Sequence, residues 1–136
     1  MILVLSTYPT RKSADNAAKK IIEKELAACV NIIKIDESIY KWKGKIEMHP
    51  EYQLLIKTRK KAYLQLEAFI KQTHPHEVPE IIYIEIKGGS KDYLSWMDST
   101  VLPRPLRVPL DLTALKRASD PSKELKSAKN PSTLSR

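Results

Sequence analysis

Apolar side chains follow two different spacings in the first part of the chain. Ile2–Leu5 is a continuous apolar run, which predicts a buried strand. Pro9–Ser13 interrupts the run and offers two side chains suited to begin a helix. Apolar residues then recur every three or four positions, which predicts an amphipathic helix. Its core-facing stripe consists of Ala14, Ala17, Ala18, Ile21, Ile22 and Leu26.

The middle of the chain has the pattern of two strands joined by a tight turn. Cys29–Ile35 is apolar and β-branched, and Ile39–Trp42 continues it after a charged break at Asp36-Glu37. Lys43-Gly44 is a candidate two-residue turn, because glycine accepts a positive φ. The return strand alternates through Ile46, Met48, Tyr52, Leu54 and Ile56. Pro50 within it predicts an edge position or a bulge.

A second helix and a further strand follow. Ala62–Thr73 has the helical period, and His74-Pro75 ends it. Ile81–Ile86 is the fourth predicted strand, and Ser90–Met97 a short closing helix. The order β-α-β-β-α-β plus a C-terminal helix predicts an α+β fold of the ferredoxin-like, split βαβ type with an antiparallel sheet.

Composition divides the chain of 136 residues into two parts. Residues 1–102 carry 16 Lys+Arg against 13 Asp+Glu, whereas residues 103–136 carry 8 against 3 and five of the nine prolines. Most of the net charge of +8 therefore lies in the last segment, which has too few apolar side chains to offset its ordering entropy. We expect a domain at 1–102 and a basic, Pro/Ser/Lys-rich and partly flexible C-terminal extension at 103–136.

The sequence argues against several classes of protein. No apolar run approaches the roughly 20 residues that span a bilayer, and the first residues lack the basic flank of a signal peptide. Cys29 is the only cysteine, which excludes an internal disulfide and a Cys-Cys zinc motif. We therefore expect a cytoplasmic protein without membrane association.

The predicted hairpin places aromatic, acidic and imidazole groups on one face. Directly opposed residues share a face of a two-stranded ribbon. With a turn at Lys43-Gly44, the opposed pairs are Trp42 with Lys45, Tyr40 with Glu47, and Ser38 with His49. One face then presents Tyr40, Trp42, Glu47 and His49, and the other Ile39, Lys41, Ile46 and Met48. We expect this ribbon to be buried against a partner subunit, to line a ligand pocket, or to do both at a pocket between subunits.

The segment His74–Glu80 joins the second helix to the fourth strand and holds two imidazoles and two carboxylates. Pro75 and Pro79 stiffen it. His74 and His76 point the same way in an extended segment, so both can reach one metal, with Glu77 or Glu80 nearby. A tight site takes three or four ligands, and the chain has three histidines and one cysteine. We therefore expect a loose surface site, or one completed across subunits.

Cys29 lies at a helix-to-strand junction among apolar neighbours, which predicts a small buried cysteine. A thiol ligand for a soft metal such as Cu(I) is the alternative. The carboxylates are dispersed, and no Ser-His-Asp or Cys-His pairing is readable. We therefore expect neither catalysis nor an organic cofactor.

Five segments match a known family in order and spacing: Glu25–Asn31, Tyr40–Glu47, Leu55–Thr58, His74–Ile81 and Asp92–Trp96. From the first strand to about residue 100 the chain resembles the CutA divalent-cation tolerance family. The resemblance implies a ferredoxin-like fold, a tightly interlocked homotrimer, a cytoplasmic location, and a link to copper and other divalent metals. In architecture the family is similar to the PII-type signalling trimers.

The resemblance also implies clefts between subunits. The candidate metal ligands are His74, His76 and Glu77, and the candidate cleft residues are Cys29, Tyr40, Trp42, Glu47, Lys57, Glu80 and Trp96. The family usually has tyrosine at the position of His76. Some members carry cysteine where this chain has Ser6, and histidine where it has Thr73. A copper site built from those groups would retain only His74 here.

Three functions compete at this point. The first is a non-enzymatic homotrimer that binds copper or another divalent metal weakly and supports metal tolerance. The second is a PII-like trimeric sensor that binds a small anionic ligand between subunits, with Lys57 and Trp42 in contact with it. The third is a nucleic-acid binder that uses the basic extension. We do not expect nucleic acid as a partner, because the predicted strands lack the aromatic pattern of RNA-recognition sheets.

Overall fold

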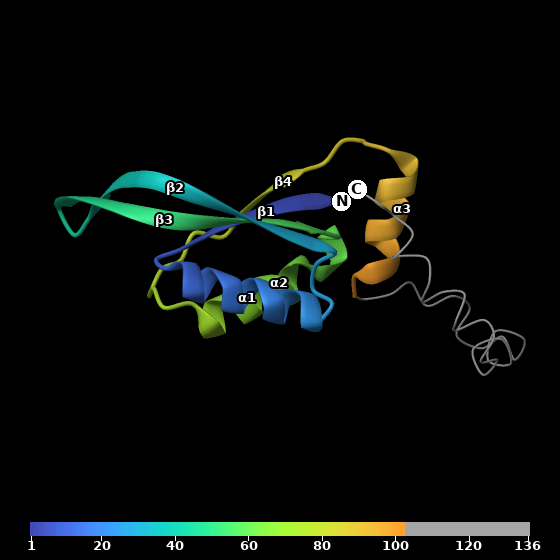
Figure 1. Cartoon of the computed structure of the whole chain (residues 1–136), viewed down its shortest axis with the longest axis horizontal. Coiled ribbons are helices and arrows are strands. Elements are labelled where there is room, and N and C mark those ends of the chain that lie inside the picture. The colour runs from blue at the N-terminus through green and yellow to red at the C-terminus, as the bar shows by residue number, and fades with distance from the viewer. Residues whose placement is uncertain (103–136) are drawn as a thin grey trace, which may run out of the picture. The chain divides into compact units, whose positions relative to one another are not determined.

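The computed structural model describes residues 1–102 of the chain. Its elements are β1 (Ile2–Tyr8), α1 (Arg11–Glu23), β2 (Cys29–Trp42), β3 (Lys45–Thr58), the 3-10 turn η1 (Lys60–Ala62), α2 (Tyr63–Thr73), β4 (Ile82–Glu85) and α3 (Lys91–Thr100). The strands form one antiparallel sheet in the order β2-β3-β1-β4 (Figure 1). The α+β, ferredoxin-like split βαβ fold is therefore confirmed.

Helix α1 begins and ends with specific hydrogen bonds. The Thr10 side chain accepts a bond from the backbone N–H of Ser13 at 3.0 Å, and the Ser13 hydroxyl faces the backbone N–H of Thr10 at 3.3 Å, which makes a capping box. At the other end Glu25 takes a left-handed φ of 57° and Leu26 N–H donates to the Ile21 carbonyl. The predicted apolar stripe ran on to Leu26, whereas the helix stops at Glu23 and Leu26 is buried in the turn that follows.

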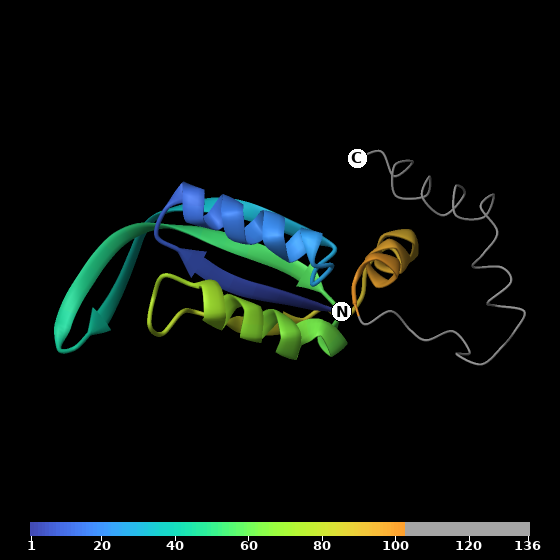
Figure 2. The same cartoon turned by 90° about the horizontal axis from the view of Figure 1, so that it is seen from below.

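One face of the sheet is covered by the chain itself. Helices α1 and α2 run side by side beneath it (Figure 2). Alternate residues of each strand point toward them, because successive side chains of a strand face opposite ways. The core that results contains Ile2, Val4, Tyr8, Ala14, Ala17, Ala18, Ile21, Leu26, Ala27, Leu54, Ile56, Leu66 and Ile70.

The opposite face of the sheet has no helix over it within residues 1–102 (Figure 1). Apolar side chains lie on it nonetheless. Ile33, Ile82 and Ile84 are 46%, 53% and 57% exposed, and the neighbouring Leu55 is half-buried. We refer to this surface as the open face. Large apolar groups gathered on one exposed surface are typical of a contact with another molecule.

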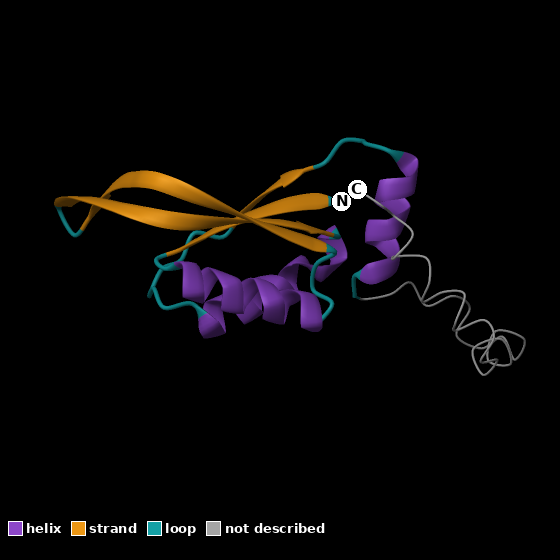
Figure 3. Cartoon of the chain, in the orientation of Figure 1, coloured by secondary structure: helices purple, strands orange, loops and turns teal. Residues whose placement is uncertain are grey.

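Strands β2 and β3 continue beyond the sheet as a long two-stranded ribbon (Figure 3). They project because β1 pairs only with Tyr52–Thr58 of β3, while β2 follows β3 to its first residue. At the tip Lys43 and Gly44 have φ values of 50° and 81°, as a type I′ turn requires. The predicted turn is therefore confirmed, and so is the register that places Tyr40 opposite Glu47 and Ser38 opposite His49.

The charged break predicted at Asp36-Glu37 is an irregularity inside β2 rather than an end of it. Ile35 pairs with Glu51 and Ser38 with His49, so two residues of β2 lie opposite Pro50 alone. This is a β-bulge. It lies beyond the end of β1, where that side of β3 has no neighbouring strand in the described chain. Both expectations for Pro50, an edge position and a bulge, are confirmed.

Helix α3 is held at the end of the sheet by a buried arginine. Arg59 is 8% exposed, and its Nε lies 3.1 Å from Oδ1 of Asp98. Its Nη1 donates to the Val101 carbonyl at 3.5 Å. Beyond the helix, Leu102 N–H donates to the Glu25 carbonyl at 2.8 Å. The extension expected at 103–136 lies outside the described residues. In residues 1–102 no helix is both long and apolar enough to span a membrane.

Candidate functional site

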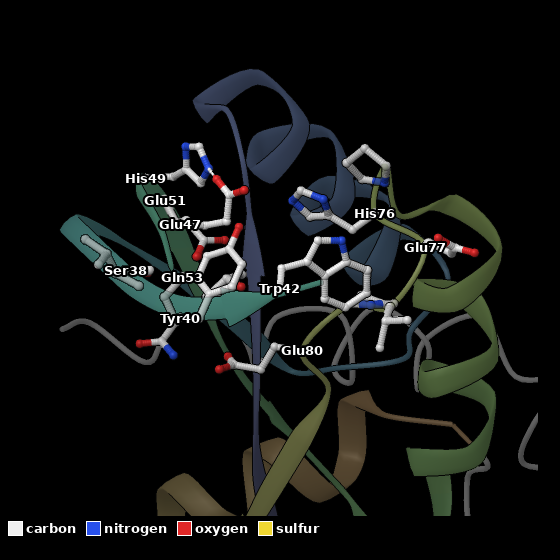
Figure 4. Close-up of a pocket in the computed structure, with 15 residues that line it drawn as sticks. Ser38, Tyr40, Trp42, Glu47, His49, Glu51, Gln53, His76, Glu77 and Glu80 are labelled. Carbon is white, nitrogen blue, oxygen red and sulfur yellow. Dashed lines mark hydrogen bonds and ion pairs between the residues drawn. The ribbon is translucent and has the colours of Figure 1, made fainter. Parts of the chain in front are cut away.

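A pocket of about 600 Å³ lies between the ribbon and the segment 74–80. The ribbon curves toward the loop that joins α2 to β4 (Figure 2). The pocket is lined by Thr7, Ile35, Ser38, Tyr40, Trp42, Glu47, His49, Glu51, Gln53, Pro75, His76, Glu77, Val78, Pro79 and Glu80 (Figure 4). Its volume is in the range of pockets that hold small molecules.

The ribbon supplies one wall of the pocket through strand alternation. Glu47, His49, Glu51 and Gln53 are every second residue of β3, so their side chains leave the same face. The Nε2 atom of His49 lies 3.1 Å from Oε2 of Glu47. Across the ribbon, the rings of Tyr40 and His49 lie 6.1 Å apart. The paired strands thus bring acid, imidazole and phenol groups together.

The other wall is the segment 74–80, and His74 fixes where it begins. The Nε2 atom of His74 is 2.7 Å from the Thr7 carbonyl, and its Nδ1 is 3.0 Å from the backbone N–H of His76. Because the N–H of His76 can only donate, Nδ1 accepts and Nε2 carries the proton that is donated to Thr7. The ring also packs on Tyr8, with centroids 4.3 Å apart.

Burial lowers the pKa of His74, and the positive charge that His76 can carry lowers it further, against the opposing effects of the Thr7 carbonyl and Glu51. The neutral ring that results suits the two hydrogen bonds. Burial likewise raises the pKa of Tyr8 to about 12, with the Ser6 hydroxyl opposing the shift. These two side chains form a neutral, packed base for the loop, while the His76 side chain lines the pocket.

The charge of the pocket is opposite to that of the chain. Its lining includes four carboxylates and two imidazoles, and no lysine or arginine is among these described residues. The carboxylates of Glu51 and Glu80 make no hydrogen bond or ion pair with any residue of the 1–102 domain. Such a lining attracts cations and repels small anions.

The donor types fit a divalent metal, but residues 1–102 of a single chain do not form a closed site. Carboxylate and imidazole groups are ordinary ligands for Zn²⁺ and Cu²⁺. However, no three His, Cys, Asp or Glu side chains in residues 1–102 lie close enough together to hold an ion. His74 would offer Nδ1 only after its bond to the His76 N–H is broken.

The structure brings together six of the ten candidate residues from the sequence, places His74 at the base of the adjoining loop, and leaves three elsewhere. Tyr40, Trp42, Glu47, His76, Glu77 and Glu80 line the pocket. Cys29, half-buried rather than fully buried, pairs with Lys57 at the opposite end of β2 and β3. There Lys57 Nζ lies 3.5 Å from the Tyr93 hydroxyl, and the Tyr93 ring lies 5.5 Å from Trp96. A role for Cys29, Lys57 and Trp96 in a cleft stays a prediction about the assembly.

Sequence reasoning left Glu51 and Gln53 out of the site, and it noted His49 on the ribbon without including it. A signal for all three was present. Once Tyr40 is opposite Glu47, every second residue of the return strand follows on the same face.

Comparison with known proteins gives a consistent result. Residues 2–100 match the family model described as CutA1 divalent ion tolerance protein. The divalent-cation tolerance protein CutA of Yersinia pestis is 41% identical over 101 residues, which cover 74% of this chain and 85% of that protein.

Solved structures give the same picture. The divalent cation tolerance protein Cut A1 of Thermus thermophilus superposes with a TM-score of 0.72 at 39% identity, covering 74% of this chain and 99% of that one. The CutA of Archaeoglobus fulgidus, described as a periplasmic divalent cation tolerance protein, superposes with a TM-score of 0.71 at 38% identity, covering 74% and 98%.

Proposed function

Because this chain belongs to the CutA1 divalent ion tolerance family, we propose that it is a non-enzymatic homotrimer that supports tolerance by binding copper or another divalent metal weakly in the pocket. One observation carries the proposal. The pocket offers imidazoles and carboxylates, and none of its described lining residues is a lysine or arginine. A cation is the ligand that such a surface favours.

The proposed ligands come from both walls. Glu47 and His49 are already within 3.1 Å of each other on the ribbon. His76 contributes from the loop, whereas the side chain of Glu77 beside it points away from the shared space and would have to turn to join the ligands (Figure 4). Two or three ligands of this kind bind a metal weakly, and a second copy of the chain can supply the rest. His74 serves as the anchor of the loop and joins the ligands only if its bond to the His76 N–H opens.

The homotrimer is supported by the open face. Residues 1–102 leave its apolar side chains exposed, and burying them stabilises an assembly by about 25 cal/mol per Å² of apolar surface. The ribbon adds to this, since Ile39, Ile46 and Met48 are 65%, 72% and 53% exposed. Association of three copies through these surfaces would cover both. It would also place the pocket, which includes Thr7 and Gln53 of the open face, at a contact between subunits.

A PII-like sensor for a small anionic ligand is the alternative, and the charges disfavour it at this pocket. Lys57, the cation predicted to contact such a ligand, lies at the other end of the sheet from Trp42. Four carboxylates would repel the anion instead. An anion would need a different cleft, close to Lys57 and Tyr93.

For the location we propose the cytoplasm. The single cysteine is compatible with a reducing compartment. The CutA of Archaeoglobus fulgidus is described as periplasmic, which is the competing location. Fractionation of cells that express the tagged full chain decides between the two compartments.

Calorimetric titration with Cu(II), Cu(I) and Zn(II) tests the proposed metal binding. The full-length protein is expected to bind at least one of them saturably, and the double variant His49→Ala, His76→Ala to lose that binding. Cys29→Ser is the matched control, because it removes a soft ligand outside the pocket and should change nothing. Absence of saturable binding in the parent protein, or its loss in Cys29→Ser alone, would contradict the proposal.

A further inference from the structure

We propose that the pocket also binds an organic cation, an aliphatic ammonium compound such as a linear polyamine, between its aromatic rings and its carboxylates. This inference rests on the proposed use of the pocket for cations and extends it to a second class of ligand. It is argued from the size of the pocket, the spacing of its acids and the exposure of its aromatic rings.

Size and spacing favour an extended cation over a bare ion. The cavity of about 600 Å³ suits a small organic molecule. Its carboxylates are spread out, since no three potential ligands of the described chain converge on one point. Figure 4 shows Glu47, Glu51 and Glu80 facing the shared space, while Glu77 points away from it. Separate carboxylates match the separate ammonium groups of a polyamine.

The aromatic rings offer ring faces that attract an organic ammonium group and that a bare metal ion would not use. Trp42 and Tyr40 line the pocket, and each is 41% exposed. The face of an indole or phenol ring attracts ammonium groups, most strongly when they are partly desolvated. The structure already contains such a contact, because Lys43 Nζ lies 5.8 Å from the centre of the Trp42 ring. Lys43 itself is not part of the pocket lining.

No cation of the described chain neutralises the pocket. The carboxylates of Glu51 and Glu80 make no ion pair in the domain, and the lining contains no lysine or arginine. An ammonium ligand would form ion pairs with these two carboxylates without competing with a neighbouring side chain. The aliphatic stem of the ligand would lie against Val78 and the rings.

Titration of the metal-stripped, full-length protein with spermidine tests the inference, with Mg²⁺ and citrate as comparison ligands. We expect saturable binding of spermidine, weaker binding of Mg²⁺ and none of citrate. Trp42→Leu is expected to lower spermidine affinity about tenfold, and Trp42→Phe less, because the phenyl ring retains part of the attraction. Glu80→Gln should lower affinity several-fold, whereas Glu23→Gln, the same change outside the pocket, should leave it unchanged.

Fluorescence provides a second readout. The chain has two tryptophans, so Trp96→Phe leaves Trp42 as the only one. Spermidine should change the emission of this variant. The inference is overturned if spermidine does not saturate, if Mg²⁺ binds equally well, or if Trp42→Leu binds normally. Should spermidine fail while copper or zinc still binds, only this inference falls. If every cation fails, the proposed function falls with it.

Discussion

The two faces of the sheet carry similar apolar side chains but differ in what covers them. On β1, Ile2 and Val4 point toward the helices and are 0% exposed, while Leu3 and Leu5, on the other face, are only partly buried. On the edge strand β4, Ile82 and Ile84 are more than half exposed. Alternation alone therefore does not tell an interior face from a surface face in this chain.

The comparison teaches that hydrophobic pattern and burial are separable. The helix-covered face is completed within one protomer, so its packing energy is available at any concentration. Nothing in residues 1–102 completes the open face, and where another molecule does so its contribution depends on how much partner is present. The stability that adjacent residues of one strand contribute can therefore depend on folding in one case and on association with a partner in the other.

Ile56 and Leu55 test this most strongly, because they are neighbours on β3 that face opposite ways. Ile56→Ala should lower the free energy of unfolding by about 2–5 kcal/mol, since it leaves a cavity under α1 and α2. The loss should be the same at low and high protein concentration, measured by denaturant unfolding. Leu55→Ala should cost less, and its cost should change with concentration. Equal behaviour of the two variants would break the comparison.

A charge on the open face should separate the copies without unfolding the protomer. Ile33→Lys removes apolar burial worth about 1.5–3 kcal/mol per site and adds a charge that must stay hydrated. Analytical ultracentrifugation should show the parent as a trimer and the variant shifted to smaller species with a retained circular dichroism spectrum. Leu64→Lys is the control, because Leu64 is 76% exposed on α2. An unchanged trimer in Ile33→Lys would contradict an assembly through this face.

His74 lies where the covered face meets the pocket, so the pH dependence of stability should show whether this histidine is held neutral there. Its pKa is below the ordinary 6.5 in the folded protein, so the unfolded chain takes up a proton first as the pH falls. The stability contributed by neutral His74 is therefore complete above pH 6.5 and is lost as the pH drops toward the lowered pKa.

Unfolding measured across that pH range should show this loss in the parent and not in His74→Gln. The substitution should also cost about 1–2 kcal/mol at neutral pH, because two hydrogen bonds and the contact with Tyr8 change. His49→Gln is the control and should keep the pH dependence. A flat profile in the parent would show that His74 is not held neutral.

The tip of the ribbon belongs to neither face of the sheet, so a substitution there should change the free energy of unfolding least. Lys43 has a left-handed φ of 50°, which asparagine adopts more readily than lysine. Lys43→Asn should therefore raise the urea midpoint, by an amount worth about 0.5 kcal/mol. The gain should not vary with protein concentration. Lys41→Asn, inside β2, should give no gain, and a loss of stability in Lys43→Asn would argue against the turn geometry.

Much of the fold could be read from the sequence because local signals agreed with it. Thr10 and Ser13 mark the start of α1, and Lys43-Gly44 fixes the register of the whole ribbon. The end of α1 was harder to predict from the sequence. Glu25 occupies the left-handed position that glycine usually marks, so the apolar stripe seemed to run on to Leu26.

The lining of the pocket could be predicted where it followed from strand pairing, whereas the residues included on family likeness concern a cleft between subunits and stay a prediction. Tyr40, Trp42 and Glu47 were placed by register, and they line the pocket. Cys29 and Lys57 were included on family likeness, and in one chain they lie at the far end of the strands. No periodicity encodes whether a neighbouring copy brings them near. The anchoring bonds of His74 were equally hidden, because Thr7 is distant in sequence.

The bulge opposite Pro50 bears on how a lone protomer would behave before it meets the copies with which we propose that it assembles. A newly made protomer would display a ribbon with apolar side chains and an unoccupied backbone edge, which invites stray strands to add on. Such addition needs an unbroken row of amide donors. Pro50 supplies none, and the charged bulge at Asp36-Glu37 disturbs the opposite strand at the same level. Pro50 and the bulge should therefore lower the tendency of a lone protomer to add strands from other chains along this edge.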